Sequence, residues 1–304
     1  MPLVAASREV CGSDLCATTS RFPCPGNWRS QCHTNALRYY CKASVKKQKK
    51  HFESSLQICL NRECVIDIHC HILPEVDDGP KSWEIAEQMC RMAAKDGTRH
   101  IVSTPHANDN YHYDREYLSH LLETLRQRIG EIPQLSLGCD FHLSFENMQS
   151  ALDAPQQYCI ANSRYLLIEF SNFSIPQQID DWISQMRERD IVPIITHPER
   201  NPLLQQSPER VLDWVKLGCA VQVTGSVLTG SWGARAQQTA QWLFKKKAVH
   251  ILASDGHDTI RWPPVLSEAR KAVAKEFGEG MAQALVERNP SAVVRNEPPP
   301  WLAR

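Results

Sequence analysis

The sequence predicts an α/β fold in which a parallel sheet closes into a (β/α) barrel, preceded by an irregular N-terminal extension. From residue 65 onward, short apolar runs rich in β-branched residues alternate with amphipathic runs of helical length. Regular alternation of this kind is typical of parallel strands joined by helices. The chain has 304 residues, 42% of them hydrophobic and 22% charged, which is ordinary for a globular protein of one barrel with an appendage.

Seven strands are expected, one fewer than in the common eight-stranded barrel. Each is a short run dominated by Val, Ile, Leu or aromatic residues and bounded by polar or turn-forming residues. The expected strands are residues 65–68, 100–103, 135–139, 165–170, 191–196, 220–223 and 249–253.

Apolar residues recur at helical spacing between these strands. In residues 82–96, for example, Ile85, Met89 and Ala93 share one face, and Gly97 follows as a natural C-terminal cap. The expected helices are residues 82–96, 115–129, 177–189, 208–217, 234–245 and 265–277.

Residues 1–64 differ from the rest in composition. They carry ten Lys/Arg and four Asp/Glu, a net charge of +6, whereas residues 65–304 have a net charge of −6. Seven of the twelve cysteines lie here, without the C-x2-C pair of a zinc ribbon and without a signal peptide toward an oxidising compartment. We expect a Cys-rich basic extension that is either disordered or not native, with the native start at or near Val65.

One motif in the extension imitates an active site. Cys32 and Arg38 match the C-x5-R pattern of cysteine-dependent tyrosine phosphatases. A phosphate-binding loop of that kind is built easily with glycine, and the five intervening residues contain none. We therefore expect no catalytic role for Cys32.

The composition also argues against two classes of function. A formal net charge of 0 is unlike that of a protein built to coat nucleic acid, so no nucleic-acid partner is expected. No apolar stretch reaches the roughly 18 residues of a transmembrane helix, so no membrane insertion is expected.

Potential metal ligands gather at the carboxyl ends of six of the seven expected strands. In a (β/α) barrel these ends share one rim, where catalytic side chains lie. Only the strand at 220–223, with Gln222 and Thr224, lacks a strong ligand, and His100 and His250 open strands and are expected to be structural. The polar residues at the rim are His69, His71, Asp77, Asp78, His106, Asp140, His142, Glu169, His197, Glu199, Arg200, Asp255 and His257.

These residue types indicate a cluster of metal ions. Histidine and carboxylate together suit Mn, Zn or Fe, whereas Mg and Ca prefer oxygen ligands alone. His69 and His71 point to the same side of their strand, because side chains repeat every two residues, and Cys70 between them points away into packing. The set exceeds what one ion can coordinate, so two or three ions are expected.

The motifs resemble those of the polymerase-and-histidinol-phosphatase (PHP) superfamily. Within it they are similar to the bacterial manganese-dependent tyrosine-protein phosphatases of the CpsB/YwqE type. The resemblance covers about residues 65–290 and rests on DIHCHILPEVDDGP at 67–80, STPH at 103–106, IEF at 168–170, THPER at 196–200 and ASDGH at 253–257.

The resemblance implies a distorted seven-stranded, TIM-like barrel of the PHP type that holds three Mn ions. The first would be bound by His69, His71, Asp140 and Asp255, the second by Asp140, Glu169 and His197, and the third by Asp78, His106 and His257. The family commonly has Glu where Asp140 bridges two ions. Arg200 would bind the phosphate, and Asp77 or His142 would assist as proton donor.

The implied activity is hydrolysis of phosphotyrosine in a protein, without a catalytic cysteine. The implied partner is an autophosphorylating bacterial tyrosine kinase that governs capsule or exopolysaccharide export, and a cytoplasmic location follows. Three alternatives stay open: a small-molecule PHP phosphoesterase such as histidinol phosphatase, a polymerase-associated nuclease, and a catalytically silent scaffold.

Overall fold

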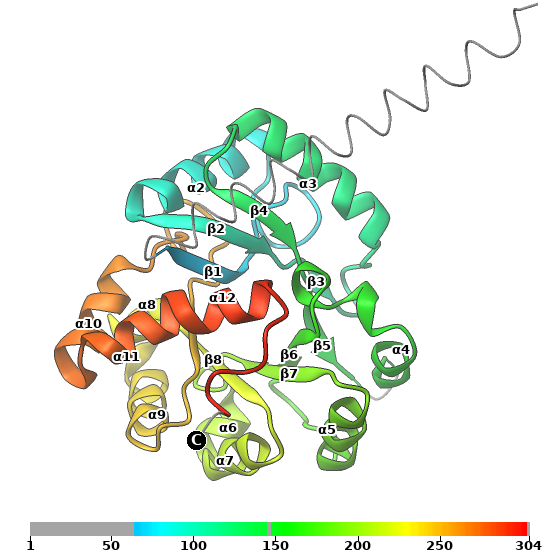
Figure 1. Ribbon diagram of the computed structural model, residues 1–304, viewed down its shortest axis with the longest axis vertical. Coiled ribbons are helices and arrows are strands. Elements are labelled where there is room, and N and C mark those ends of the chain that lie inside the picture. The colour runs from blue at the N-terminus through cyan, green and yellow to red at the C-terminus, as the bar shows by residue number, and fades with distance from the viewer. Residues whose placement is uncertain (1–63, 145–146, 303–304) are drawn as a thin grey trace, which may run out of the picture. The chain divides into compact units, whose positions relative to one another are not determined.

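The computed structural model describes residues 64–144 and 147–302 (Figure 1). The predictions made for the N-terminal extension, Cys32 included, lie outside the described residues. In the described part, all strand pairings are parallel and helices pack around the strands, so the predicted α/β class is confirmed.

The strands form two sheets rather than the closed seven-stranded barrel that we predicted. The first sheet has the order β1-β2-β4 and the second the order β3-β5-β6-β7-β8-β9. The strands are β1 (Val65–Cys70), β2 (Thr98–Ser103), β3 (His106–Ala107), β4 (Gln134–Leu137), β5 (Asp140–Leu143), β6 (Tyr165–Phe170), β7 (Val192–Thr196), β8 (Ala220–Thr224) and β9 (Ile251–Ala253).

The sheets separate at two short interruptions, one just beyond the predicted strand 100–103 and one at the end of the predicted strand 135–139. Thr104 and Pro105 divide β2 from β3, and Gly138 and Cys139 divide β4 from β5. Pro105 has no N–H for a ladder, and a Cβ on Gly138 would come within 3.0 Å of a Val102 methyl group. Beyond these interruptions, β3 and β5 pair with each other and belong to the second sheet.

The seam between β1 and β9 is also not a strand ladder. A single parallel bridge joins Cys70 to Gly256, beyond the end of β9. The backbone N–H of Asp255 donates to the carbonyl of His69 at 2.9 Å, and the N–H of His71 donates to the carbonyl of Gly256 at 2.8 Å. These bonds place the end of β1 directly beside the segment that follows β9.

The six predicted helices are present, and shorter ones lie between them. The α-helices are α2 (Trp83–Asp96), α3 (Arg115–Ile129), α4 (Met148–Asp153), α5 (Ile179–Glu188), α6 (Pro202–Gln206), α7 (Glu209–Lys216), α8 (Gly225–Leu228), α9 (Gly233–Lys245), α10 (Ser267–Phe277), α11 (Glu279–Gln283) and α12 (Asn289–Val294). Two short 3-10 helices, η1 (Pro155–Gln157) and η2 (Ile160–Asn162), and one π-helix, η3 (Ala284–Arg288), lie between them.

Local signals place the helix ends. Ser82 caps the start of α2 through its hydroxyl oxygen, which accepts from the N–H of Ile85, and Asp114 caps α3 in the same way. Gly97 ends α2 at φ 112°, a left-handed conformation that glycine adopts without strain.

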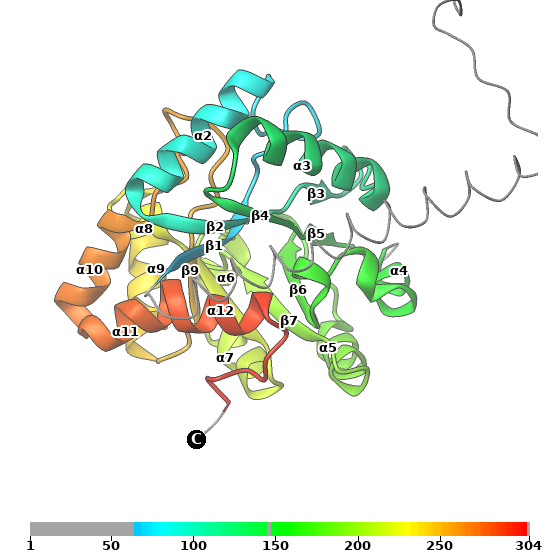
Figure 2. The same ribbon diagram turned by 45° about the horizontal axis from the view of Figure 1, so that its top comes forward.

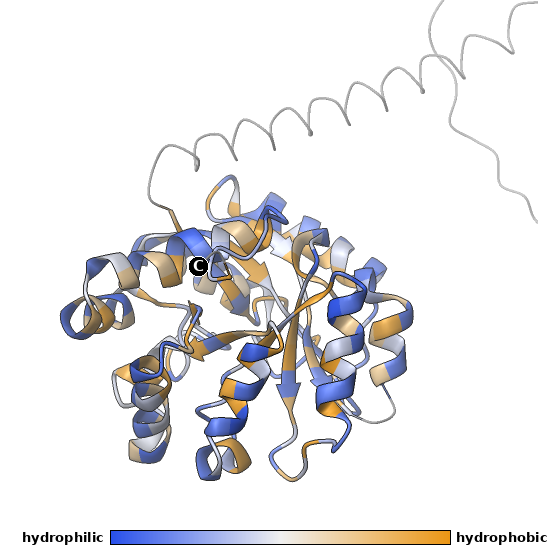
Figure 3. Cartoon of the chain, turned by 60° about the horizontal axis from the view of Figure 1, so that its bottom comes forward, coloured by the Kyte–Doolittle hydropathy of each residue, from blue (hydrophilic) through white to orange (hydrophobic). Residues whose placement is uncertain are grey.

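Three apolar cores hold the layers together. Helices α2 and α3 cover the three-stranded sheet through residues such as Met89 and Leu122 (Figure 2). Helices α5, α7 and α9 cover the six-stranded sheet through Trp182, Trp214 and Leu243. The third core comprises the opposite faces of the strands, and Val293 of α12 packs into it. In Figure 3 the strands at the centre are largely apolar and the outer faces of the helices hydrophilic.

None of the helices within the described ranges is long and apolar enough to cross a lipid bilayer.

Candidate metal centre

The nine predicted metal ligands converge at the carboxyl ends of the strands. They form four overlapping groups in which the potential ligand atoms lie within 4.8 Å of one another. The groups are His71, Asp78, His106 and His257; His69, His71 and Asp140; His69, His197 and Asp255; and His106, Asp140 and Glu169. Residues separated by up to 188 positions therefore meet in one cluster, as expected for one rim.

His69 and His71 aim two nitrogen lone pairs at the centre. The Nδ1 of His69 lies 3.0 Å from the Oε1 of Gln222, and the Nδ1 of His71 lies 2.7 Å from the Oδ2 of Asp77. Because both oxygens accept, the neutral form of each ring carries its proton on Nδ1, which leaves the Nε2 lone pair for a metal ion. The two Nε2 atoms lie 3.3 Å apart. Such a tautomer, fixed by a partner on the far nitrogen, is typical of metal-ligating histidines.

The surroundings of Asp140 indicate that the cluster suits a cation. Both of its carboxylate oxygens are buried and neither has a hydrogen-bond partner. Its Oδ2 lies 3.5 Å from the Nε2 of His69 and 3.2 Å from the Nδ1 of His106. A buried carboxylate without hydrogen bonds is costly unless a positive charge compensates it. The donor set of imidazole and carboxylate around Asp140 therefore fits a bound divalent ion.

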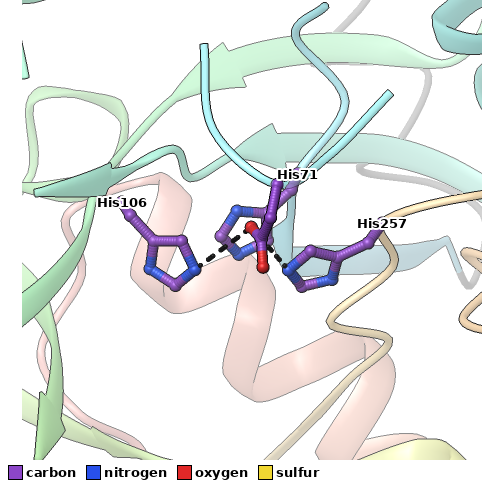
Figure 4. Close-up of side chains that lie close together, drawn as sticks. His71, His106 and His257 are labelled. Carbon is purple, nitrogen blue, oxygen red and sulfur yellow. Dashed lines mark ion pairs between the residues drawn. The ribbon is translucent and has the colours of Figure 1, made fainter. Parts of the chain in front are cut away.

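Asp78, His106 and His257 form one end of the cluster (Figure 4). The Oδ1 of Asp78 lies 3.5 Å from the Nε2 of His106 and 3.3 Å from the Nε2 of His257. His71 points into the same space, and its ring stacks on that of His257 with centroids 4.0 Å apart. The four side chains come from β3 and from the loops that follow β1 and β9.

Glu169, His197 and Asp255 lie on the other side. The Oε1 of Glu169 is 3.7 Å from the Nε2 of His197, and the Oδ1 of Asp255 is 3.2 Å from the Nε2 of His69. By distance His197 groups with His69 and Asp255, and Glu169 groups with His106 and Asp140. This sharing differs in detail from the arrangement that the family resemblance implied.

The backbone is specialised where it carries these ligands. His197 and Asp255 have φ values of 29° and 51°, a region that non-glycine residues seldom adopt. A Cβ on Gly256 would meet three atoms of Pro264 at 2.9 Å, and a Cβ on Gly79 would meet the carbonyl oxygen of His71 at 2.8 Å. Glycine is thus required for the close packing of both ligand-bearing loops.

Charges in the centre compensate one another. Burial lowers the pKa of His71, but the ion pair with Asp77 outweighs this effect and raises the pKa to about 9. Burial raises the pKa of Asp140, but His69 and His106 outweigh it and hold the pKa well below its usual range. Burial and the charge of Arg200 lower the pKa of His197 to about 4. A cation that binds beside His71 therefore displaces a proton from that ring, whereas His197 is already neutral near pH 7.

Arg200, the predicted phosphate ligand, reaches the edge of the cluster. Its guanidinium pairs with the carboxylate of Asp255 and donates to the Oγ1 of Thr224 at 3.3 Å. It also lies over the ring of Trp232, with Cζ 3.8 Å from the ring centroid. The guanidinium is held between the centre and an aromatic wall.

The two predicted proton donors lie in different surroundings. Asp77 is buried, pairs with His71, and also accepts from the backbone N–H of Gly79 at 2.9 Å. His142 is partly exposed, and its Nδ1 lies 3.1 Å from the Oε2 of Glu169. His142 therefore has the freer access to a ligand at the rim.

The sequence that builds this site also matches a protein-family model. The model for capsular polysaccharide synthesis proteins CpsB/CapC matches residues 65–295. The chain belongs to the CpsB/CapC family. The resemblance inferred from the sequence motifs is thereby confirmed.

Individual CpsB/CapC relatives match over most of their own length. Tyrosine-protein phosphatase YwqE of Bacillus subtilis is 29% identical, with 77% of this chain and 92% of the relative covered. Tyrosine-protein phosphatase CpsB of Streptococcus pneumoniae is 28% identical, with 77% and 99% covered.

Solved structures agree with this assignment. One, described as YwqE from Bacillus subtilis and CpsB from Streptococcus pneumoniae, unique metal-dependent tyrosine phosphatases, matches with a TM-score of 0.72 and 29% identity over 77% of this chain and 95% of that chain. A phosphotriesterase homology protein from Escherichia coli, 10% identical with a TM-score of 0.52 over 76% of this chain and 99% of that chain, shares the fold alone.

Two residues of this CpsB/CapC-family site were missed from the sequence. Gln222 stands at the end of the one strand to which we assigned no strong ligand, yet it orients His69 from 153 residues away. Trp232 contacts Arg200 from the loop before α9. Position at the rim was the only available signal for Gln222, and Trp232 had none.

Proposed function

We propose that this chain is a metal-dependent phosphatase that hydrolyses phosphotyrosine in proteins. The observation that carries the proposal is the convergence of nine imidazole and carboxylate ligands beside one arginine, in a chain of the CpsB/CapC family. Relatives that it matches over most of their length are named tyrosine-protein phosphatases.

The cluster would hold three divalent ions, which we expect to be Mn. We assign His69, His71, Asp140 and Asp255 to the first ion, Asp140, Glu169 and His197 to the second, and Asp78, His106 and His257 to the third. Bound ions of this kind supply neutralisation of the phosphate charge and lower the pKa of water toward neutrality. The orphaned oxygens of Asp140 support its bridging role, because neither is engaged in a hydrogen bond and both could accept a cation.

The chain's own residues bind and orient the substrate. Arg200 would exchange its contact with Asp255 for two phosphate oxygens, since its planar fork matches them. The phosphorus–oxygen bond to tyrosine breaks as water attacks in line, and the products are tyrosine and inorganic phosphate. Tyrosinate leaves readily, with a pKa of about 10, so little help from an acid is needed. His142 is better placed than Asp77 to give that help, and we expect Asp77 to position His71 instead.

The substrate we propose is a tyrosine kinase that phosphorylates itself and controls capsule or exopolysaccharide export. The support is the family, whose description is capsular polysaccharide synthesis. Such a kinase would present its phosphotyrosine residues in the cytoplasm, and we therefore propose a cytoplasmic location for this protein.

A comparison of substrates tests the proposal. The protein loaded with Mn should hydrolyse a phosphotyrosyl peptide far faster than histidinol phosphate. It should lose activity with a chelator and keep it after thiol alkylation, because no cysteine takes part. Faster turnover of histidinol phosphate would identify a small-molecule phosphatase, and loss of activity after alkylation would point to cysteine chemistry instead.

A further inference from the structure

A cavity of about 130 Å³ opens beside the metal centre, next to Arg200. Glu169 and His197 line it on the side of the centre, and Arg200 lies at the junction. A cavity of about 150 Å³ is enough to hold a benzene molecule. The space beside Arg200 is slightly smaller than that, so it can accept at most one aromatic ring.

Three apolar side chains, those of Phe170, Leu204 and Trp232, line part of this cavity. Phe170 and Leu204 are buried, and the ring of Trp232 is partly exposed. The lining also includes the polar residues Asn172, Thr196 and Asn201. Ligand pockets combine apolar and aromatic side chains with a few placed polar groups in this way. An aryl phosphate suits such a lining, with its charge at one end and its ring at the other.

Trp232 is held rigidly in the wall. Its Nε1 donates to the Oγ of Ser226 at 3.0 Å, and its ring stacks on that of Trp262, with centroids 5.4 Å apart and an interplanar angle of 6°. The carbonyl of Trp262 in turn accepts from the backbone N–H of His257 at 2.8 Å. The wall of the cavity is thus tied to a ligand-bearing loop of the metal centre.

Arg200 links the two ends of the cavity. Its guanidinium lies 3.8 Å from the Trp232 ring centroid and pairs with Asp255 on the other side. A phosphate held by this guanidinium near Glu169 and His197 would direct the attached group along Trp232. A short alkyl group would leave that wall in contact with water.

We propose that this cavity receives the aromatic ring of the substrate and that Trp232 makes the site selective for aryl over alkyl phosphates. The inference rests on the proposed phosphatase function and names the part of the site that recognises tyrosine. Removing the Trp232 ring should therefore lower the affinity for ring-bearing ligands more than that for ringless ones.

Binding of two phosphonates, which are not hydrolysed, tests this without measuring turnover. Calorimetry on the Mn-loaded protein should give a Kd for phenylphosphonate at least about tenfold below that for methylphosphonate, the scale expected when an apolar pocket is filled. In Trp232→Leu the ratio should fall to about threefold or less, and in Trp232→Phe most of it should remain. Metal content and circular dichroism establish that each variant is folded and loaded.

Trp242→Phe serves as the matched control, because Trp242 lies on α9 beside Lys246 and does not line the cavity. Its ratio should equal that of the wild type. Equal affinity of the wild type for both phosphonates would overturn the proposal. So would an equal loss for both in Trp232→Leu, since Trp232 would then act only on Arg200. Hydrolysis of a phosphotyrosyl peptide is measured separately, so a failure of the cavity and a failure of the phosphatase function are distinguishable.

Discussion

Replacing Gln222 by leucine should weaken metal binding while leaving the fold intact. Gln222 is fully buried on β8, and its Oε1 accepts the Nδ1 proton of His69 at 3.0 Å. This bond keeps the Nε2 lone pair of His69 directed at Asp140 and Asp255. Loss of such a supporting partner typically costs about 10- to 100-fold in metal affinity.

The effect on folding should be small, because two terms offset each other. In Gln222→Leu the buried Nδ1–H of His69 loses its acceptor, at a cost of about 1–3 kcal/mol. The side-chain amide nitrogen of Gln222 is itself buried without a partner, and removing it recovers a similar amount. Leucine has nearly the same volume, so the packing of β8 is retained.

Competition with a chromophoric chelator measures the metal affinity, and urea unfolding in excess chelator measures the stability. Gln222→Glu is the control, because it keeps an acceptor for His69 and should bind metal at least as tightly as the wild type. The reasoning is refuted if Gln222→Leu binds metal within about threefold of the wild type, below the range expected for a lost partner, or if its metal loss accompanies unfolding.

Three further predictions address other parts of the structure. Arg200→Ala should reduce turnover of a phosphotyrosyl peptide by about 100-fold or more and leave the metal content unchanged; loss of bound metal would assign Arg200 a structural role. Gly256→Ala should destabilise the protein by about 1–3 kcal/mol in thermal unfolding, since its Cβ would meet Pro264 at 2.9 Å, and an unchanged midpoint would contradict this. Burial and the charge of Arg126 lower the pKa of His100 to about 4, so the unfolded chain takes up the proton first as the pH falls. Between about pH 6.5 and 4, the wild type should therefore lose about 3 kcal/mol of unfolding free energy that His100→Gln does not lose. Parallel profiles of unfolding free energy against pH for the two proteins, measured in urea, would exclude this effect.

The convergence of the candidate ligands could be predicted from the sequence because parallel strands place their carboxyl ends together. His69, Glu169 and His197 each lie at or just beyond the end of an apolar run. Because the ends of parallel strands share one rim, these side chains come together there. His100 was predicted to be structural because it begins a strand, and its Nε2 lies 2.7 Å from the hydroxyl of Ser136, away from the centre. Helix ends were equally accessible, because Ser82 and Gly97 act locally.

The closure of the sheet could not be predicted in this way. The breaks at Pro105 and Gly138 depend on how two neighbouring strands fit against Val102 and on where the next sheet begins. The sequence shows a proline and a glycine but not the partner strand, so β3 and β5 were not predicted as strands: the predicted strands 100–103 and 135–139 stop before His106 and Asp140. The join between Cys70 and Gly256 spans 186 residues and leaves no local pattern.

Side-chain pairs between residues far apart in the chain could not be predicted either, because they leave no local sequence pattern. Gln222 and Trp232 bear no residue type that indicates metal or phosphate chemistry, and their roles come from His69 and Arg200. Residues that support a ligand are identified by contact, whereas ligands are identified by residue type and position. The sequence therefore predicted which candidate ligands lie together better than it predicted the residues around them.

Elemental analysis of the purified protein, paired with Asp140→Asn, tests the central claim most directly. Asp140 joins two of the four ligand groups, and neither of its buried oxygens has a hydrogen-bond partner. The wild type should contain two or three divalent ions per chain, and Asp140→Asn should contain fewer while remaining folded. A wild-type chain that binds at most one ion, or an Asp140→Asn variant with the full complement, would contradict a metal cluster at the rim.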